Sequence, residues 1–264
     1  YLDRQGKLGA FYRAVRDERY LYVRNYMPHI SYHQPSAWPG QGEIRAEISR
    51  VAAKGDLTPP QRHYAGPTKP AEELYDCRED PLNLHNLVGD AAHAKALDRL
   101  RAEHRRWVLA SRDVGFLPEC EIWRRSRGTT PYEMARDPRA YPLETILDAA
   151  DLVGRGAEQR DALVANLAAA DPAVRFWAVI GLRCLGKEAA PAARALEKAL
   201  IEVKDNYDYY AFGGAHSQAI STGQSYRYTG KPFDNDRGLN LQRTHQVEQR
   251  QVKRYQDEGD EYAQ

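Results

Sequence analysis

The chain has few cysteines, almost no net charge and no long run of apolar residues. Its three cysteines, Cys77, Cys120 and Cys184, are far apart and odd in number, so they fit neither a metal-binding spacing nor a disulfide framework, and a single Cys77–Cys120 bridge stays open. A net charge of +1 gives no general attraction to nucleic acid or to an anionic membrane. No apolar run approaches the roughly 20 residues that span a bilayer. The sequence therefore predicts neither a nucleic-acid partner nor a membrane span.

The N-terminus also lacks a leader pattern. The first residue is Tyr1, and no basic stretch followed by an apolar core comes after it, so no signal peptide is visible. Either a leader has been removed or these residues come from within a longer chain. With 264 residues, of which 42% are hydrophobic, the sequence can form one large domain or two modest ones with a packed core.

The beginning of the chain predicts a β-hairpin. Residues 11–16 and 20–26 have strand-like composition, with a polar turn between them. Arginines and tyrosines interleave along both strands, and we expect alternation to place arginines on one face and aromatic rings on the other, as in a half-buried sheet. A Pro- and Gly-rich irregular loop follows over residues 28–42. A short helix is then expected from Glu43 to Lys54, with Ile44, Ile48 and Val51 on one face.

The most informative stretch is EELYDCREDPLNLHNL, residues 72–87, which joins a strand, a turn and a helix start. Leu74 and Tyr75 between acidic residues indicate a short edge strand, and Asp80-Pro81 marks the turn. Asn86 or Asp90 then caps a long helix, whose predicted inner stripe is Ala96, Leu97, Leu100, His104, Trp107 and Val108. We expect an α+β fold, a small antiparallel sheet packed on a long helix.

A helical segment is predicted after this sheet. Helices are expected at Leu143–Val153, Glu158–Ala169, Pro172–Leu185 and from Ala189 to about Val203. Asp171-Pro172 starts the third helix and Gly186 ends it. The run DPAVRFWAVIGLRCLG resembles the second helix of a HEAT-type repeat, with inward-facing Val174, Ala178, Leu182 and Leu185. The segment holds roughly one and a half to two such units, fewer than the three or so that a stable array normally needs.

The last part of the chain, residues 204–264, has a different composition, rich in Tyr, Gly, Gln, Asn and Asp. Its run YRYTGKPFDNDRGLNL resembles part of an RHS-type repeat. One such repeat leaves unpaired strand edges and too little core. We therefore expect weak β-hairpins and a partly disordered tail.

The stretch 72–87 resembles the C-terminal subdomain of the formylglycine-dependent sulfatases, which commonly carry a Glu-Leu-Tyr-Asp strand, an acidic-Pro turn and a following Asn-Leu. RAVRDERYLYVRNYMP (13–28) is similar to the strands that enter this subdomain, and RWVLASRDVGFLPECEI (106–122) to its exit. Order and spacing are most similar to the heparan N-sulfatase (sulfamidase) branch. The expected parts are a sulfatase C-terminal subdomain (1–125), a linker (126–142), HEAT-like repeats (143–203) and an RHS-like tail (204–264).

The resemblance also implies where catalysis occurs. Such sulfatases need Cys or Ser followed by x-Pro-x-Arg, which is oxidised to formylglycine, and a calcium ion held by Asp and Asn side chains. No cysteine here is followed by that pattern, and after Ser36 the proline comes one place late, at Pro39. We therefore expect no catalytic and no metal-binding residue in this chain, and we expect formylglycine and calcium in a preceding α/β domain of a periplasmic or secreted parent.

The loop from Met27 to Gln34 is the candidate substrate rim. In related sulfatases, loops of this subdomain can line the pocket mouth, so His29, Tyr32 and His33 could meet a sugar ring or a sulfate group. The alternative is an ordinary surface loop with solvated histidines. Pro28 and Pro35 argue against the helix that would let the two histidines share a metal ion.

Three functions are compatible with these features. The first is part of a sulfatase that hydrolyses sulfate esters or N-sulfates of carbohydrates, inactive alone and partnered by the N-terminal sulfatase domain. The second is a non-catalytic binding or scaffold protein whose helical residues 143–203 hold a protein partner. The third, an RHS-type secreted or toxin-associated fragment, rests only on the tail.

Overall fold

The computed structural model describes residues 11–34 and 42–206. They belong to one compact unit, Tyr1–Asn206, and the second unit, Tyr207–Gln264, lies outside the described residues. The RHS-like hairpins and the tail predicted from residue 204 therefore fall almost wholly outside them, and so does part of the loop expected over residues 28–42.

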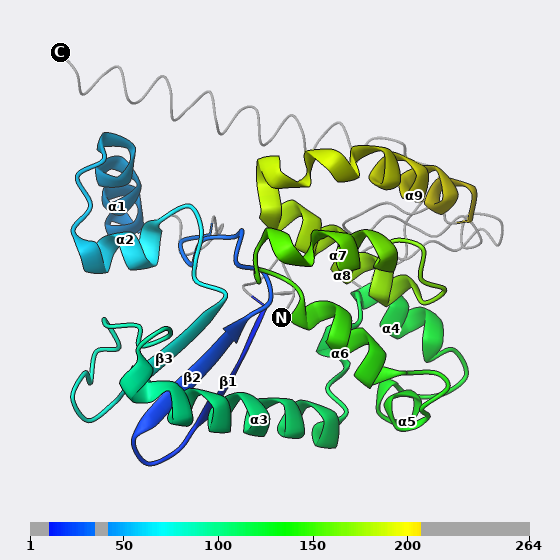
Figure 1. Ribbon diagram of the computed structural model, residues 1–264, viewed down its shortest axis with the longest axis horizontal. Coiled ribbons are helices and arrows are strands. Elements are labelled where there is room, and N and C mark those ends of the chain that lie inside the picture. The colour runs from blue at the N-terminus through cyan, green and yellow to red at the C-terminus, as the bar shows by residue number, and fades with distance from the viewer. Residues whose placement is uncertain (1–10, 35–41, 207–264) are drawn as a thin grey trace. The chain divides into compact units, whose positions relative to one another are not determined.

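The sheet is antiparallel and has the strand order β1-β2-β3 (Figure 1). Its strands are β1 (Tyr12–Arg16), β2 (Tyr20–Asn25) and β3 (Glu72–Asp76), with Tyr22 opposite both Val15 and Leu74. Asp17 closes the hairpin, because its carboxylate accepts hydrogen bonds from the backbone N–H groups of Arg19 and Tyr20 at 2.8 and 2.6 Å. The predicted hairpin is confirmed.

The edge position predicted for β3 is also confirmed, and the chain that follows covers this edge. The Asn86 side chain accepts a hydrogen bond from Leu74 N–H at 3.0 Å and donates one to Glu72 C=O at 3.0 Å. Leu87 N–H donates to Leu74 C=O at 2.8 Å. The Asn86 side chain therefore makes its hydrogen bonds to β3 and does not cap a helix. Asp90 caps the next helical turn, because its carboxylate accepts a hydrogen bond from Ala92 N–H at 2.9 Å.

The long helix α3 (Ala94–Ser111) packs on β1 and β2 after the short 3₁₀ turn η2 (Ala91–His93). Its buried stripe is Leu97, Leu100, His104 and Val108. Val108 is buried as predicted, but the prediction was wrong for its neighbour Trp107, which is 45% exposed. The predicted α+β arrangement, a small antiparallel sheet packed on a long helix, is confirmed.

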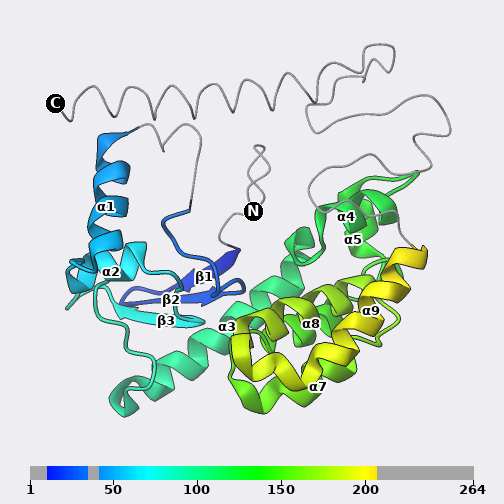
Figure 2. The ribbon, with the colours of Figure 1, turned by 90° about the horizontal axis from the view of Figure 1, so that it is seen from above.

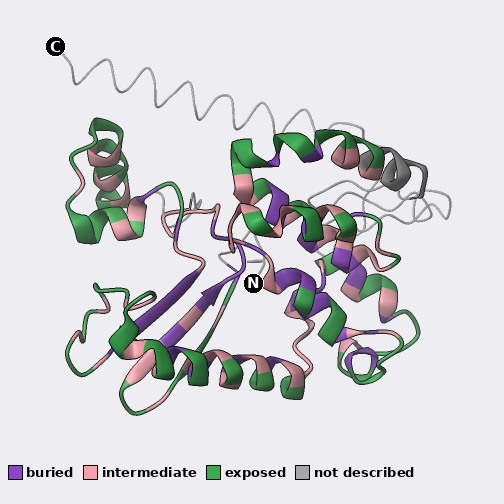
Figure 3. Cartoon of the chain, in the orientation of Figure 1, coloured by how far each residue is buried: buried purple, intermediate pink, exposed green. Residues whose placement is uncertain are grey.

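Between β2 and β3 the chain forms α1 (Glu43–Lys54) and α2 (Pro59–Ala65), which pack on each other. The bounds of α1 match the prediction. Neither helix contains a buried residue, and Ile44 of the predicted apolar face is exposed. Figure 3 shows this contrast, with α1 largely exposed and β3 buried along its whole length.

The remaining helices follow α3 without a further strand among the described residues. Asp171 caps α8, accepting from Ala173 N–H at 2.8 Å, and Gly186 ends it with a positive φ of 56°, as the sequence predicts. The elements are η3 (Val114–Phe116), α4 (Glu119–Arg125), α5 (Pro131–Arg136), α6 (Leu143–Asp151), η4 (Ala157–Gln159), α7 (Arg160–Asn166), α8 (Pro172–Leu185), η5 (Gly186–Ala192) and α9 (Ala193–Asn206).

Helix α8 packs against both α6 and α7, and Figure 2 shows α7 and α8 side by side. Val174, Ala178 and Leu182 are buried as predicted, and Leu185 is half-buried. Gly181 allows the close approach of α7, because a Cβ at this position would lie 2.4 Å from Leu163 Cδ2. A packed helical segment is therefore present, and its HEAT-like kind stays a prediction.

One hydrophobic core joins the hairpin to the helical segment. Phe11 and Tyr26 beside the strands pack around Trp177 of α8, with ring centroids 5.6 and 5.9 Å from its ring. Trp177 Nε1–H also donates to Phe116 C=O at 2.9 Å. Tyr141, in the stretch predicted to be a linker, is fully buried in the same core. The domain boundaries predicted at 125 and 143 stay predictions.

Two further features bear on the sequence-based expectations. Cys77, Cys120 and Cys184 are all free thiols, so the Cys77–Cys120 bridge left open by the sequence is not formed. Among residues 11–34 and 42–206, no helix is both long and apolar enough to cross a membrane.

Replacing Trp177 by alanine tests whether hairpin and helices share one core. We expect Trp177→Ala to lower the free energy of unfolding by about 3–5 kcal/mol, because a large buried ring leaves a cavity. The matched control, Trp123→Ala, removes a ring that is 60% exposed and should change stability by no more than about 0.5 kcal/mol. Urea unfolding followed by circular dichroism measures both, and equal effects would contradict the shared core.

Candidate functional site

The two faces of the sheet carry different polar clusters. Because neighbouring residues of a strand point to opposite faces, Glu72 and Leu74 of β3 lie on the α3 side and Glu73 and Tyr75 on the other. The same rule corrects the sequence prediction that arginines lie on one face of the sheet and aromatic rings on the other. Arg24 has the same parity as Tyr22 and Tyr26, and all three are buried together.

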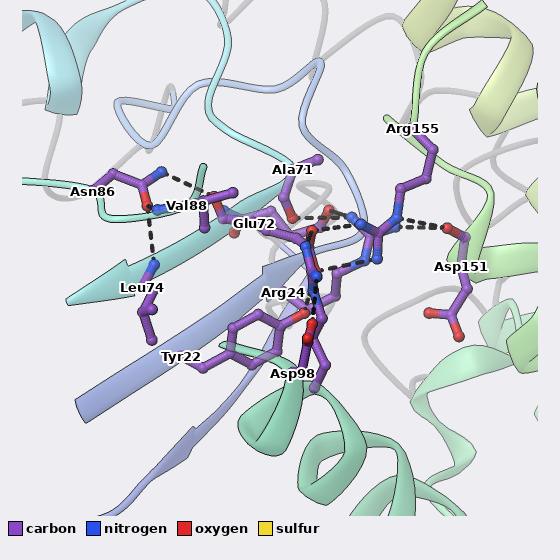
Figure 4. Close-up of polar contacts among 12 residues, drawn as sticks. Tyr22, Arg24, Ala71, Glu72, Leu74, Asn86, Val88, Asp98, Asp151 and Arg155 are labelled. Carbon is purple, nitrogen blue, oxygen red and sulfur yellow. Dashed lines mark hydrogen bonds and ion pairs between the residues drawn. The ribbon is translucent and has the colours of Figure 1, made fainter. Parts of the chain in front are cut away.

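Glu72 is the centre of the cluster on the α3 side (Figure 4). Its buried carboxylate accepts hydrogen bonds from Tyr22 Oη at 2.6 Å, from Arg101 Nε and Nη2 at 2.9 and 2.7 Å, and from Arg155 Nη2 at 3.1 Å. Burial raises the pKa of Glu72, but the hydrogen bonds from Arg101 and Tyr22 and the charge of Arg155 outweigh it and leave the pKa at about 2. Glu72 is therefore a carboxylate at neutral pH.

Arg24 joins this cluster to the helical segment. Its side chain, in a residue 1% exposed, donates to Asn25 C=O and Ala71 C=O at 3.0 and 2.9 Å, and to Asp151 C=O and Val153 C=O at 3.1 and 2.7 Å. Burial lowers the pKa of Arg24. Five donors on one planar group make arginine suited to binding several carbonyls at once.

A cavity of about 670 Å³ opens beside these residues. Three arginines of its lining form ion pairs: Arg101 with Glu72, Arg105 with Asp148 and Asp151, and Arg155 with Glu72. His104, in the same lining, has its pKa lowered to about 4 by burial and by the charges of Arg24 and Arg13, so it is neutral at pH 7. The ion pairs of Arg101, Arg105 and Arg155 fit a network that holds the sheet to the helices.

Glu73 is the centre of the cluster on the opposite face. Its buried carboxylate accepts hydrogen bonds from Tyr32 Oη, Tyr75 Oη and Asn25 Nδ2. His63 of α2 lies nearby, with Nε2 3.6 Å from Glu73 Oε2 and 3.2 Å from Tyr75 Oη. Burial and the hydrogen bonds to Glu73 raise the pKa of both tyrosines, which therefore stay protonated and donate.

The three residues predicted for the substrate rim do not converge. Tyr32 lies against Glu73, whereas His33 Nε2 lies 3.0 Å from Ser49 Oγ of α1. His29 Nδ1 lies 3.3 Å from Cys184 Sγ of α8. Burial and then the charges of Arg183 and Lys69 lower the pKa of His29 to about 4. A role for these residues at a substrate pocket stays a prediction.

Lys69 is a residue of this face that sequence reasoning missed. It lies between α2 and β3 and is 5% exposed, and its Nζ has no hydrogen-bond partner among the described residues. Its Nζ lies 4.9 Å from the centroid of the Tyr32 ring. The signal available in the sequence was weak, since a lysine between Thr68 and Pro70 reads as an ordinary loop residue.

The described residues do not fit a metal centre. Within residues 11–34 and 42–206, no three His, Cys, Asp or Glu side chains converge so that they could hold a metal ion. We therefore assign no calcium ligand to them.

The comparisons with known proteins point to sulfatases. The chain is similar to two proteins of Formosa agariphila (strain DSM 15362), each described as an ulvan-active sulfatase. One is 36% identical over 128 residues, which are 48% of this chain and 22% of the sulfatase. The other is 28% identical over 102 residues, which are 39% of this chain and 18% of the sulfatase. No family model matches the chain, and no solved structure matches it.

Part of this chain is thus related to sulfatases. The chain spans less than a quarter of the length of each sulfatase that it matches.

Glu72→Gln tests the charge network through its pH dependence. Because the folded pKa of about 2 lies below the ordinary value of 4.5, the carboxylate stabilises the fold fully above pH 4.5 and loses this effect as pH falls towards 2. We expect the variant to be less stable by about 3 kcal/mol at pH 7, with the difference shrinking below pH 4.5. Glu79→Gln, an exposed control in the turn after β3, should show neither effect. Urea unfolding at several pH values measures this, and a pH-independent difference would contradict it.

Proposed function

We propose that residues 1–125 belong to the C-terminal subdomain of a formylglycine-dependent sulfatase that hydrolyses sulfate esters or N-sulfates of carbohydrates. The observation that carries the proposal is the 36% identity to a sulfatase over 128 residues. In this proposal the chain contributes structure and part of the substrate surface, and a preceding catalytic domain is its partner.

The residues that resemble the family have structural positions, which supports a non-catalytic role. The Glu-Leu-Tyr-Asp stretch lies in β3 (Glu72–Asp76), and Glu72 and Glu73 of this strand both accept buried hydrogen bonds. The 264 residues contain no Cys or Ser followed by x-Pro-x-Arg. The proposal accordingly places formylglycine and calcium on other residues of the parent enzyme.

The substrate class follows from the relatives and from the sequence motifs. Both relatives are described as acting on ulvan, while the order of motifs is most similar to the heparan N-sulfatase branch. We therefore propose a sulfated carbohydrate, with ulvan and N-sulfated glucosamine as the two candidates to compare. The packing of α6, α7 and α8 supports HEAT-like helices after the subdomain, and the RHS-like tail belongs to the same proposal.

The isolated chain provides the first test. We expect no calcium-dependent sulfate release from 4-nitrophenyl sulfate, N-sulfated glucosamine or ulvan, because no residue can form the formylglycine nucleophile. Ion chromatography of free sulfate measures this. Release above the rate of a heat-denatured sample would show that the chain is catalytic by itself and would overturn the proposal.

The coding sequence upstream of Tyr1 provides the second test. A Cys/Ser-x-Pro-x-Arg motif in the same reading frame would support the proposal, and the longer product should then release sulfate from one of the two candidate carbohydrates. A complete upstream frame without this motif would overturn it.

A further inference from the structure

Lys69 is held in place by the backbone around it. Its N–H donates to Pro28 C=O at 2.9 Å, and Asn25 Nδ2 donates to the C=O of the next residue, Pro70, at 2.8 Å. Pro28 begins the loop of residues 28–34, here called the rim loop, which carries His29 and Tyr32. The segment with Lys69 and the rim loop are thus fixed to each other, which sets the position of the Lys69 side chain.

The ammonium group of Lys69 is buried without a hydrogen-bond partner among the described residues. Its closest aromatic contact is the Tyr32 ring, at 4.9 Å from Nζ to the centroid. Cation–π attraction compensates only part of the hydration that a buried ammonium loses. Buried charges in proteins are normally paired, so an anion is the partner that this position lacks.

Glu73 does not supply that anion. It is the acid whose charge acts on Lys69, but its oxygens accept hydrogen bonds from Tyr32, Tyr75 and Asn25, and it forms no ion pair with Lys69 in the described part of the chain. No salt bridge joins Lys69 to any other acid of the described residues, so its ammonium group lacks an anionic partner there.

We propose that Lys69, with His29 beside it, binds a sulfate or carboxylate group of an acidic carbohydrate. The anion itself is inferred from the buried, unpaired ammonium, and its origin in a carbohydrate rests on the proposed function. Because Tyr32 covers the ammonium, binding moves the Tyr32 ring aside and replaces the cation–π contact by a charge-assisted hydrogen bond.

The site has a defined pH dependence. Burial lowers the pKa of Lys69 to about 8, although the charge of Glu73 raises it. The ammonium is therefore lost as pH rises through about 8, and affinity for the anion falls with it. His29, already neutral at pH 7, contributes no such change above that pH. The groups that face Lys69 are His29 and Tyr32 from the rim loop and Glu73 from β3, with His63 from α2 behind Glu73.

Titration of the full 264-residue chain with small ligands tests the site. The probes are glucose 6-sulfate and glucuronic acid, with glucose as the uncharged control and inorganic sulfate as the bare anion. We expect both acidic sugars to bind more tightly than glucose by about tenfold or more, with a shift in the NMR signals of the Tyr32 ring. Inorganic sulfate as tight as glucose 6-sulfate would overturn the assignment to carbohydrate.

The matched variants are Lys69→Met and Lys54→Met, the latter replacing an exposed lysine at the end of α1. Lys69→Met should lose about tenfold or more in affinity for the acidic sugars and should also lose the fall in affinity above pH 8, while Lys54→Met should change neither. Lys69→Arg, which keeps the charge, should retain binding. Circular dichroism shows that each variant is folded, and binding that survives in folded Lys69→Met would overturn the proposal.

These outcomes are separable from those for the proposed function. An upstream sulfatase motif together with absent sugar binding would reject only the Lys69 site. Sugar binding that depends on Lys69 in a chain without the upstream motif would reject the sulfatase and keep the site.

Discussion

The buried guanidinium of Arg24 is the constraint on which the rest of the fold depends. It donates to carbonyls in β2, in the segment before β3, and at the end of α6 and just after it, so it fixes three parts of the chain at one point. Buried carbonyls need donors, and no other side chain could supply four N–H groups in one plane. With the rings around Trp177 packed beside it, this group makes the sheet and the helices interdependent.

Local patterns in the sequence predict much of the secondary structure. Asp17 closes the hairpin, Asp171 starts α8 and Glu43 begins α1 where the sequence indicates, because caps and turns are decided by neighbouring residues. Arg24 could not be predicted in the same way. Its acceptors at Asp151 and Val153 are 127 and 129 residues away, and the sequence alone does not show that they meet. Alternation along β2 does place Arg24 on the same face as Tyr22 and Tyr26, contrary to the predicted separation of arginines from aromatic rings.

The candidate site was predictable to a similar extent. The sequence indicates the loop from Met27 to Gln34, and Tyr32 does reach the polar cluster on β3. His29 and His33 diverge, because one packs on α8 and the other on α1. Lys69 is notable only once the hydrogen bonds of Glu73 are known, since its lack of a partner is a property of the tertiary structure. Residue types can suggest a site, but which charge is left unpaired depends on the whole fold.

The way in which Asn86 and Leu87 cover β3 has a consequence for how this sheet can associate. They occupy outward backbone groups of Glu72 and Leu74, the groups that a further strand would need. Unprotected strand edges can form hydrogen bonds with strands of other molecules. The other edge strand, β1, has no strand on its outer side among the described residues. Any additional strand, whether from the same polypeptide or from another, would therefore extend the sheet in one direction, and the opposite side is closed to polymerisation.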